Sequence, residues 1–462
     1  MNKKEMLNWL EDQEEMLSNT ARAIWEKPEL AMEEVFASGL QRDILKRAGF
    51  SIRDVPGLPT AFVAEYGSGG PILGILGEYD ALPDLSQQPG PERKAVTEHG
   101  PGHGCGHNLL GTAGVGAALA LAQAVESGDL KAVVRYYGCP AEETISGKTL
   151  MAREHVFDDL DACVTWHPAS YTAPWANSML ANLSVKFRFR GIPAHAASAA
   201  ELGRSALDAV ELMNVGANYL REHVNEKVRM HYVITNGGSV PNTVPEDSEV
   251  WYMLRAPHFS MVRETFRRLK GIASGAAQMT ETELAEVRLE SAAWEVLTNE
   301  TICEVIDRNM KELGGPGFND EDRQFAAQML ETFGPGEQIK GFPPFFVPPS
   351  YEGQALHEGV ADPVGRGICI MASSDVGDVS WITPLCQFGA AVWPLGIPTH
   401  TWRNTACTSS HLAMRGMMFA GKTMAAVLWD LAADPDLLKK ARDEFNRATE
   451  KQKYVCALDE DI

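Results

Sequence analysis

The sequence predicts an α/β protein, with a catalytic domain built on a largely parallel central sheet flanked by helices and a second, α+β domain inserted into it. Three observations support this prediction. Short apolar runs bounded by glycine and proline alternate with helical segments early in the chain. Near Leu183 this pattern changes to strict alternation of apolar and polar residues. The 462 residues also exceed what one ordinary core organises, so more than one domain is expected.

The larger domain is expected to be discontinuous, over residues 1–182 and 299–462. Strands are expected where apolar runs stop at glycine or proline, and helices where apolar residues recur at helical spacing. Alternation of the two indicates buried parallel strands covered by helices. The expected strands are 59–67, 70–83, 131–140, 161–168 and the strand-like region 378–396. The expected helices are 3–45 with a turn at Pro28, Leu109–Val125, Ile302–Leu313, Glu321–Phe333 and His411–Leu431, and 341–353 is expected to be a loop.

The inserted domain is expected over residues 183–298. Its segments follow the order β-α-β-β-α-β, which is the ferredoxin-like unit. Because a sheet of this kind leaves an edge strand exposed, the domain is expected to serve dimerisation. The expected strands are 183–191, 227–238, 248–257 and 285–296, and the expected helices are 203–224 and 260–279.

Composition and charge exclude several classes of function. The net charge of −21 disfavours binding to nucleic acid and to anionic membranes, because such binding depends on lysine and arginine side chains that neutralise phosphates. The N-terminus lacks the apolar core of a secretory signal, and no run of about 18 apolar residues predicts a membrane span. The eight cysteines follow no disulfide spacing, so reduced thiols and a cytoplasmic location are expected.

The segment HGCGHN, residues 103–108, carries the most informative chemistry. Cys105 and His107 are separated by one glycine, which lets a thiolate and an imidazole approach one point. A thiolate suits zinc and can bridge two ions. The alternative is a glycine-rich turn with a buried cysteine and a surface histidine, and this motif alone does not decide between the two.

Two adjacent carboxylates, Glu142 and Glu143, follow the expected strand 131–140. Ligands of open α/β sheets gather at the carboxyl ends of the strands. One carboxylate there can bind a metal while its neighbour takes a proton from water. The alternative is a pair of acidic residues in the first turn of a helix, which the helix dipole favours.

His167 also ends an expected strand, His400 follows another, and Asp80 ends the strand-like run 70–83. A single histidine is more often structural, and Asp80 alone fits an ordinary strand-to-turn transition. Several such residues at the strand ends of one domain together predict a site for two metal ions. Asp80 would then orient a ligand or the base.

Taken in order, these segments resemble the M20 metallopeptidase and amidohydrolase family, and especially its branch of aminobenzoyl-glutamate and indole-acetyl-amino-acid hydrolases. One such motif is weak, whereas the ordered set is specific and covers nearly the whole chain. Glu78 and Asn108 depart from the pattern, since many relatives have aspartate there. The matching segments are GEYDALP, HGCGHN, CPAEE, TWHP, GIPAHAA, PNTVP, LRAP and THTW.

The resemblance implies roles for individual residues. Glu142 matches the general base and Asp80 the carboxylate that orients the metal site. His195 matches a histidine that stabilises the oxyanion, commonly in the site of the partner subunit. Asn242 and Arg255 match substrate contacts, although Arg255 without the family pattern would fit a surface ion pair. The implied metal ligands are Cys105, His107, Glu143, His167 and His400.

The function that follows is hydrolysis of the amide bond of an N-acyl or N-aroyl amino acid, with p-aminobenzoyl-glutamate placed first. Two divalent ions, zinc or manganese, would serve as cofactors, and the chain would form a homodimer or a heterodimer with a homologous subunit. Two alternatives stay open. The substrate could carry another C–N bond, as in an indole-acetyl-amino acid, a dipeptide or an aromatic amine, or the chain could be a partner subunit of a related amidohydrolase.

Overall fold

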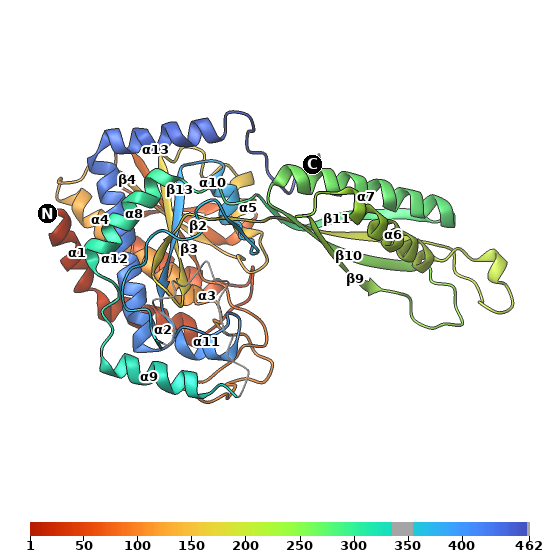
Figure 1. Ribbon diagram of the computed structural model, residues 1–462, viewed down its shortest axis with the longest axis horizontal. Helices are drawn as coiled ribbons and strands as arrows, with labels where there is room; N and C mark the ends of the chain where they lie inside the picture. Colours follow the sequence, from red (N-terminus) through yellow and green to blue (C-terminus); the bar gives the residue numbers. More distant parts are fainter. Residues whose placement is uncertain (335–353, 460–462) are drawn as a thin grey trace. The chain divides into compact units, whose positions relative to one another are not determined.

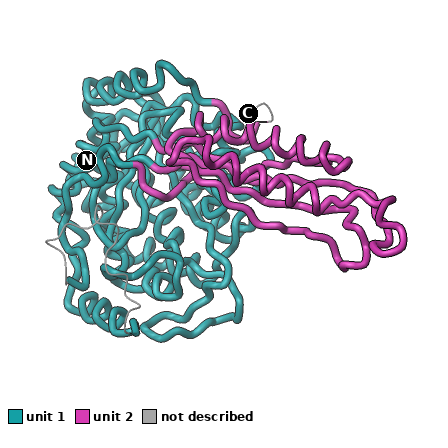
Figure 2. The backbone as a smooth tube through the Cα atoms, turned by 45° about the vertical axis from the view of Figure 1, so that its right-hand side comes forward, with its two compact units in different colours: residues 1–178, 297–368, 379–454 teal, residues 179–296, 369–378, 455–462 magenta. Residues whose placement is uncertain are grey.

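The computed structural model describes residues 1–334 and 354–459, and the chain divides into two compact units (Figure 2). Unit 1 comprises Met1–Ser178, Leu297–Ile368 and Val379–Tyr454, and unit 2 comprises Met179–Val296, Cys369–Asp378 and Val455–Ile462. Unit 2 therefore includes two late stretches that the expected boundaries place in the larger domain. The expected loop 341–353 lies outside the described residues.

Unit 1 is built on a seven-stranded sheet in the order β1-β2-β4-β3-β5-β13-β6. The four inner strands β4, β3, β5 and β13 are parallel, whereas β1, β2 and β6 pair antiparallel at the two sides. The largely parallel sheet is thus confirmed. The strands are β1 Ser51–Val55, β2 Leu58–Tyr66, β3 Ile72–Glu78, β4 Val133–Cys139, β5 Ala162–Ala169, β6 Ala173–Trp175 and β13 Leu385–Ala391.

Helices α4 and α12 contact each other and the sheet, and they carry much of the apolar core (Figure 1). By length and composition α4 could cross a membrane, but 89% of its apolar window is buried in the fold, as in a core helix. The helices of unit 1 are α1 Lys3–Glu11, α2 Glu14–Glu26, α3 Val35–Arg47, α4 His107–Glu126, α5 Gly147–Arg153, α8 Glu300–Leu313, α9 Asp320–Glu331, α11 Trp402–Cys407, α12 His411–Ala433 and α13 Pro435–Ala448.

Unit 2 has the β-α-β-β-α-β order that the sequence predicts (Figure 1). Its strands form an antiparallel sheet in the order β11-β8-β10-β9, and α6 and α7 pack against it. Residues alternate between buried and more exposed along β10, because one face of the sheet lies under the helices. The elements are β8 Ala181–Arg190, α6 Ala206–Leu220, β9 Arg229–Asn236, β10 Asp247–Ala256, α7 Phe259–Thr280 and β11 Glu283–Ala293.

Two local expectations differ from the structure. The first residues of the strand-like region 378–396 belong to the short helix α10, Val376–Ser380, and only Leu385–Ala391 forms a strand. Short apolar runs do not distinguish a strand from a buried helix, which explains the error. The expected turn at Pro28 lies in the break between α2 and α3, but a further break after Glu11 makes the segment 3–45 three helices. The remaining short strands, β7 Ser178–Met179 and β12 Cys369–Ile370, pair with each other.

Candidate metal centre

The chemically informative residues of unit 1 meet at one edge of its sheet. Strands β3, β4 and β5 are parallel neighbours, so their carboxyl ends share that edge. Asp80 follows β3, Glu142 and Glu143 follow β4, and His167 lies near the end of β5. The start of α4 adds Cys105 and His107, and the turn before α11 adds His400.

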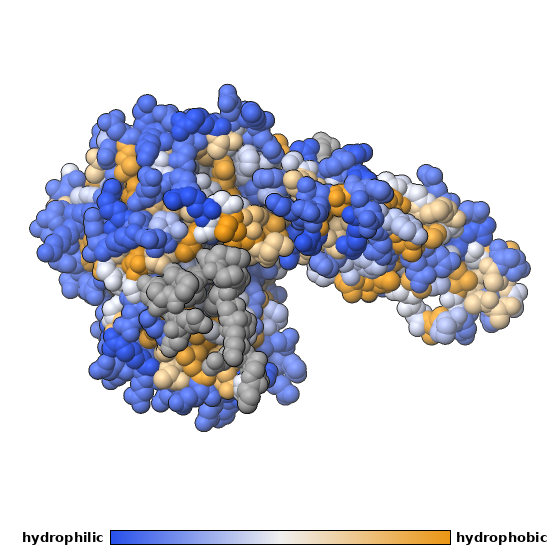
Figure 3. All heavy atoms as spheres, in the orientation of Figure 1, coloured by the Kyte–Doolittle hydropathy of each residue, from blue (hydrophilic) through white to orange (hydrophobic). Residues whose placement is uncertain are grey.

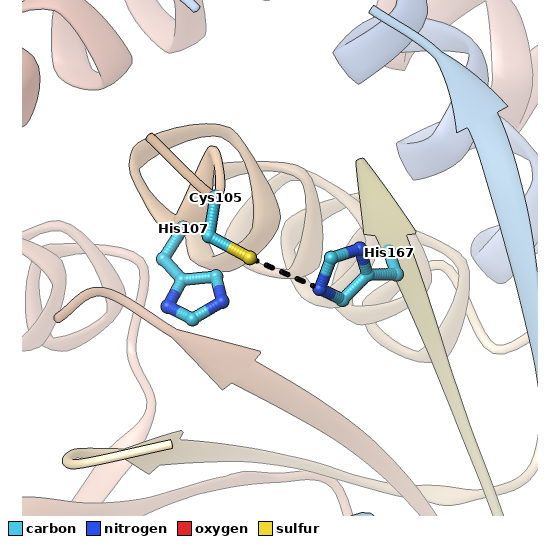
Figure 4. Close-up of side chains that lie close together, drawn as sticks. All are labelled: Cys105, His107 and His167. Atoms are coloured by element: carbon cyan, nitrogen blue, oxygen red, sulfur yellow. Dashed lines mark hydrogen bonds between the residues drawn. The ribbon is translucent and has the colours of Figure 1, made fainter. Parts of the chain in front are cut away.

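Cys105, His107 and His167 form the first cluster (Figure 4). Sγ of Cys105 lies 3.4 Å from Nε2 of His167, and one donor atom from each residue lies within 4.8 Å of the others. Gly106, with φ of +82°, makes the left-handed turn that brings Cys105 beside the first residue of α4. The expected role of the intervening glycine therefore has a structural counterpart.

A second cluster shares the thiol and consists of Cys105, Glu143 and His400, whose donor atoms also lie within 4.8 Å. Oε2 of Glu143 is 3.7 Å from Nε2 of His400. The His400 side chain is half exposed, and its φ of +58° is unusual for a residue with a Cβ. Two donor groups that share one thiol could hold two neighbouring ions.

Asp80 holds both sides of this arrangement. Its Oδ1 lies 2.8 Å from Nδ1 of His107, and its Oδ2 accepts a hydrogen bond from the backbone N of Glu143 at 2.9 Å. The carboxylate therefore fixes the ring of His107 so that Nε2 faces the cluster.

Glu142 stands on a tightly built loop. Its Oε2 is 3.9 Å from Nε2 of His107, and its side chain is only 10% exposed. The preceding residue, Ala141, has φ of +56°, and its backbone N donates to the buried carboxyl of Glu34 at 2.9 Å. Non-glycine residues in this conformation persist only where surrounding contacts impose it, and they concentrate at functional sites.

His167 is oriented from two directions. Its Nδ1 lies 2.7 Å from the carbonyl oxygen of Pro168, which leaves Nε2 facing Cys105. Trp175 stacks on the imidazole with ring centroids 5.8 Å apart and an angle of 29°. These two contacts fix the orientation of the ring.

Burial dominates the electrostatics of the cluster. It raises the pKa of Glu143 to about 7 and the pKa of the Cys105 thiol well above its usual range. It lowers the pKa of His167 to about 4, and His107 acts in the same direction. Burial alone would raise the pKa of Asp80, but His107 and the Glu143 amide hold it below its usual value.

The donor set fits divalent metal ions. Several buried donor atoms have no hydrogen-bond partner, which is costly unless another ligand satisfies them. Sulfur and imidazole suit zinc, and carboxylates suit both zinc and manganese. The unsatisfied atoms include Oε2 of Glu78, Oε1 of Glu143 and Nε2 of His107.

A cavity of about 480 Å³ opens beside His400. Its size is that of a small-molecule pocket. Leu85, Arg93, Trp402 and Arg403 contribute to its walls, so it offers apolar, aromatic and cationic surface next to the cluster.

The remaining expected site residues lie in unit 2. Nδ1 of His195 accepts from the backbone N of Ala197 and of Ser198, both at 3.2 Å, so its Nε2 carries the proton and is a donor. The Asn242 carbonyl accepts from the backbone N of Ala196 at 3.1 Å, which joins the two loops. Nε of Arg255 is buried without a hydrogen-bond partner, and no described carboxylate forms an ion pair with this side chain. The surface ion pair considered for Arg255 is therefore absent among the described residues.

Two residues of unit 1 that were given no role in the sequence analysis lie at the cluster. Glu78 was noted only as a departure from relatives, yet its Oε2 lies 3.3 Å from Nε2 of His107. Lys148, in α5, lies 2.6 Å from the other oxygen of Glu78. The spacing of Glu78 and Asp80, two residues apart at a strand end, was a signal that both face one side.

The fold and the cluster together define a metal-dependent hydrolase of amide bonds. The chain belongs to peptidase family M20/M25/M40, whose sequence profile matches residues 74–355. Across 98% of this chain and 96% of the relative, it is 40% identical to one subunit of the p-aminobenzoyl-glutamate hydrolase of Escherichia coli. It is 28% identical to the Xaa-Arg dipeptidase of Mus musculus across 96% and 92% of the two chains.

Solved structures share the fold at low sequence identity. An aminobenzoyl-glutamate utilization protein from Klebsiella pneumoniae matches with a TM-score of 0.63 and 18% identity, over 92% of this chain and 97% of that one. A dinuclear metal-binding peptidase of the M20 family from Bacillus subtilis matches with a TM-score of 0.57 and 18% identity, over 91% and 99%. The expected fold class is thereby confirmed.

Proposed function

We propose that this chain hydrolyses the amide bond of N-aroyl and N-acyl amino acids, with p-aminobenzoyl-glutamate as the foremost substrate. The observation that carries the proposal is the convergence of Cys105, His107, Glu143, His167 and His400 beside the carboxylate of Glu142. The identity to the p-aminobenzoyl-glutamate hydrolase of Escherichia coli, over nearly the full length of both chains, supports the choice of substrate.

These five residues would hold two divalent ions, zinc or manganese. Bound there, the ions would supply Lewis acidity for the carbonyl and for the attacking water. The Cys105 thiol and the imidazole groups favour zinc, while the carboxylates also accept manganese. Asp80 keeps the His107 ring in place for this purpose.

Glu142 would act as the general base and then as the general acid. Its carboxylate takes the proton of the attacking water and passes it to the leaving nitrogen of the amide. Its Oε2 lies 3.9 Å from Nε2 of His107, beside the five residues that would hold the ions. The cavity beside His400, with Trp402 in its wall, would receive the acyl or aroyl group.

Unit 2 would supply the groups that recognise the rest of the substrate. The Nε2–H of His195 is a donor suited to a developing oxyanion, an interaction typically worth about 3 kcal/mol. Arg255, with a buried Nε that lacks a partner, would clamp the substrate carboxylate together with Asn242.

A second copy or a homologous subunit would pair with unit 2. Strand β9 lies at the edge of its sheet and exposes hydrophobic side chains, which gather on this side in Figure 3. Tyr232 is 38%, Val233 54% and Ile234 39% exposed. Such an edge is a natural pairing surface. Two similar proteins of Escherichia coli carry the names of different subunits of one hydrolase, which supports a heteromeric partner.

We place the reaction in the cytoplasm, because the eight cysteines form no disulfide among the described residues and would stay reduced there.

Hydrolysis of p-aminobenzoyl-glutamate by the metal-loaded chain tests the main proposal. Release of p-aminobenzoate is measured for the wild type, for Glu142→Gln and for Glu126→Gln, an exposed control at the end of α4. We expect Glu142→Gln to lose about 100-fold or more in kcat while retaining its metal, and Glu126→Gln to resemble the wild type. Equal turnover by all three would contradict the role of Glu142.

A further inference from the structure

A buried ion pair joins the end of β3 to α5 directly behind the cluster. Nζ of Lys148 lies 2.6 Å from Oε1 of Glu78. The Lys148 side chain is fully buried and that of Glu78 is 2% exposed. A lysine is almost never fully buried without a partner, because desolvation of its charge is expensive. This pair therefore needs a reason to exist inside the fold.

The second oxygen of Glu78 points toward the cluster. Oε2 lies 3.3 Å from Nε2 of His107, and neither atom has a hydrogen-bond partner. Glu78, His107 and Glu142 also place one donor atom each within 4.8 Å of one another. Asp80 contacts the opposite nitrogen of the same ring at 2.8 Å, so Glu78 and Asp80 divide the two sides of His107 between them.

Lys148 also contributes to the charge balance of the metal-loaded site. The anionic groups of that site are the thiolate of Cys105 and the carboxylates of Glu78, Asp80, Glu142 and Glu143. Two divalent ions would balance four of these five charges, and Lys148 would balance the fifth. Without that cation, the buried site would retain an uncompensated negative charge.

We propose that Glu78 is an additional ligand of the ion bound at His107, and that Lys148 is a positioning residue that aims Glu78 and neutralises it. The proposal rests on the proposed function only in that the site holds metal ions. It adds one carboxylate oxygen, from Glu78, to the five metal ligands expected from the sequence. One of the two ions would then depend on Glu78 and Lys148, whereas an ion held by Cys105, Glu143 and His400 would not.

The test measures metal binding without substrate. Wild type, Glu78→Gln, Lys148→Met and the double variant are stripped with a chelator and titrated with Zn²⁺ or Mn²⁺ against a chromophoric competitor. Metal content per chain is then determined by mass spectrometry. Lys3→Met is the matched control, because Lys3 forms a 2.7 Å ion pair with Asp430 elsewhere in unit 1.

We expect Glu78→Gln to weaken the binding of one ion by about 10- to 100-fold and to leave the other unchanged. Lys148→Met should do the same, and the double variant should be no weaker than the single ones because the two residues act as one unit. Lys3→Met should bind both ions like the wild type. When the variants are loaded with Co²⁺ instead, the absorption band of the bond between cobalt and the Cys105 thiolate should persist in every variant.

The double variant keeps the test decisive if a single substitution does not fold, because it removes both buried charges together. A structural role alone would lower thermal stability in the single variants and restore two-ion binding in the double one, which would overturn the proposal. Wild-type affinity for both ions in Glu78→Gln would also overturn it. Failure of the wild type to bind two ions would instead refute the proposed function itself, so the two failures are distinguishable.

Discussion

Oδ1 of Asp80 lies 2.8 Å from Nδ1 of His107, and both side chains are excluded from solvent. The same carboxylate accepts the backbone N–H of Glu143 through its other oxygen. Asp80 therefore connects the ends of β3 and β4 with the start of α4. A long loop separates β3 from α4 in the sequence. The contact between Asp80 and His107 therefore helps to fix the position of α4 relative to β3 at the site.

Replacing Asp80 by asparagine should weaken metal binding by about 10- to 100-fold, because the amide cannot accept from both His107 and the Glu143 backbone as the carboxylate does. Isothermal titration of the metal-free protein measures this change. Asp84→Asn is the control, since Asp84 is exposed and forms an ion pair with the exposed His99. Equal losses in the two variants would mean that the effect is general rather than specific to His107.

Glu34 predicts a particular pH dependence of stability. Burial, with Asp80 acting in the same direction, raises its pKa from 4.5 to about 7, and its side chain is fully buried. Between those values the folded protein keeps a proton that the unfolded chain releases, so stability should fall as pH rises from about 4.5 to about 7. The total loss from this one group is on the order of 3 kcal/mol.

The Glu34→Gln variant isolates that contribution. Glutamine keeps an acceptor for the backbone N of Ala141 and has no charge to bury. The free energy of unfolding in urea, measured at fixed metal concentration, should decline less with pH in the variant than in the wild type. Parallel pH profiles would show that Glu34 does not carry a raised pKa in the folded protein.

Gly147 closes the loop that carries Glu142 and Glu143. A Cβ at this position would lie 1.7 Å from the backbone oxygen of Pro140, which no side-chain movement relieves. Gly147→Ala should therefore displace the loop and abolish both activity and tight metal binding. Gly39→Ala, in α3, meets nothing within 4 Å and should retain both. Activity and metal content of the two purified variants check this prediction, and a fully active Gly147→Ala would contradict it.

Much of the larger sheet could be predicted because its strands are short apolar runs with clear ends, and the candidate ligands stand at those ends. Glu142 follows Val133–Cys139, and His167 lies near the end of Ala162–Ala169. Strict alternation likewise predicted β8, and the succession of helical and strand-like segments after it predicted the order of unit 2. Local pattern thus carries the elements, and the strand-end rule carries part of the site.

The rest depends on contacts that a local pattern does not record. Lys148 and Glu78 are partners across the fold, and a single sequence contains no mark of their pairing. The same holds for Glu34 and Ala141. Helix α13 is different, because the sequence does carry a signal for its start. Asp434 followed by Pro435 is typical of a helix N-terminus, and the Asp434 side chain accepts hydrogen bonds from the backbone N of Asp436 and Leu437.

A mixture of two inactive variants should reveal whether His195 serves the site of the other subunit. If it does, a hybrid dimer of Glu142→Gln and His195→Ala contains one site with both an intact Glu142 and an intact His195. Random exchange of subunits should then restore about a quarter of the wild-type rate, because half of the dimers are hybrids with one working site each. The control pairs Glu142→Gln with a chain that carries both substitutions, which should stay inactive. If each subunit supplied its own His195, the first mixture would show no recovery, since no site would contain both groups.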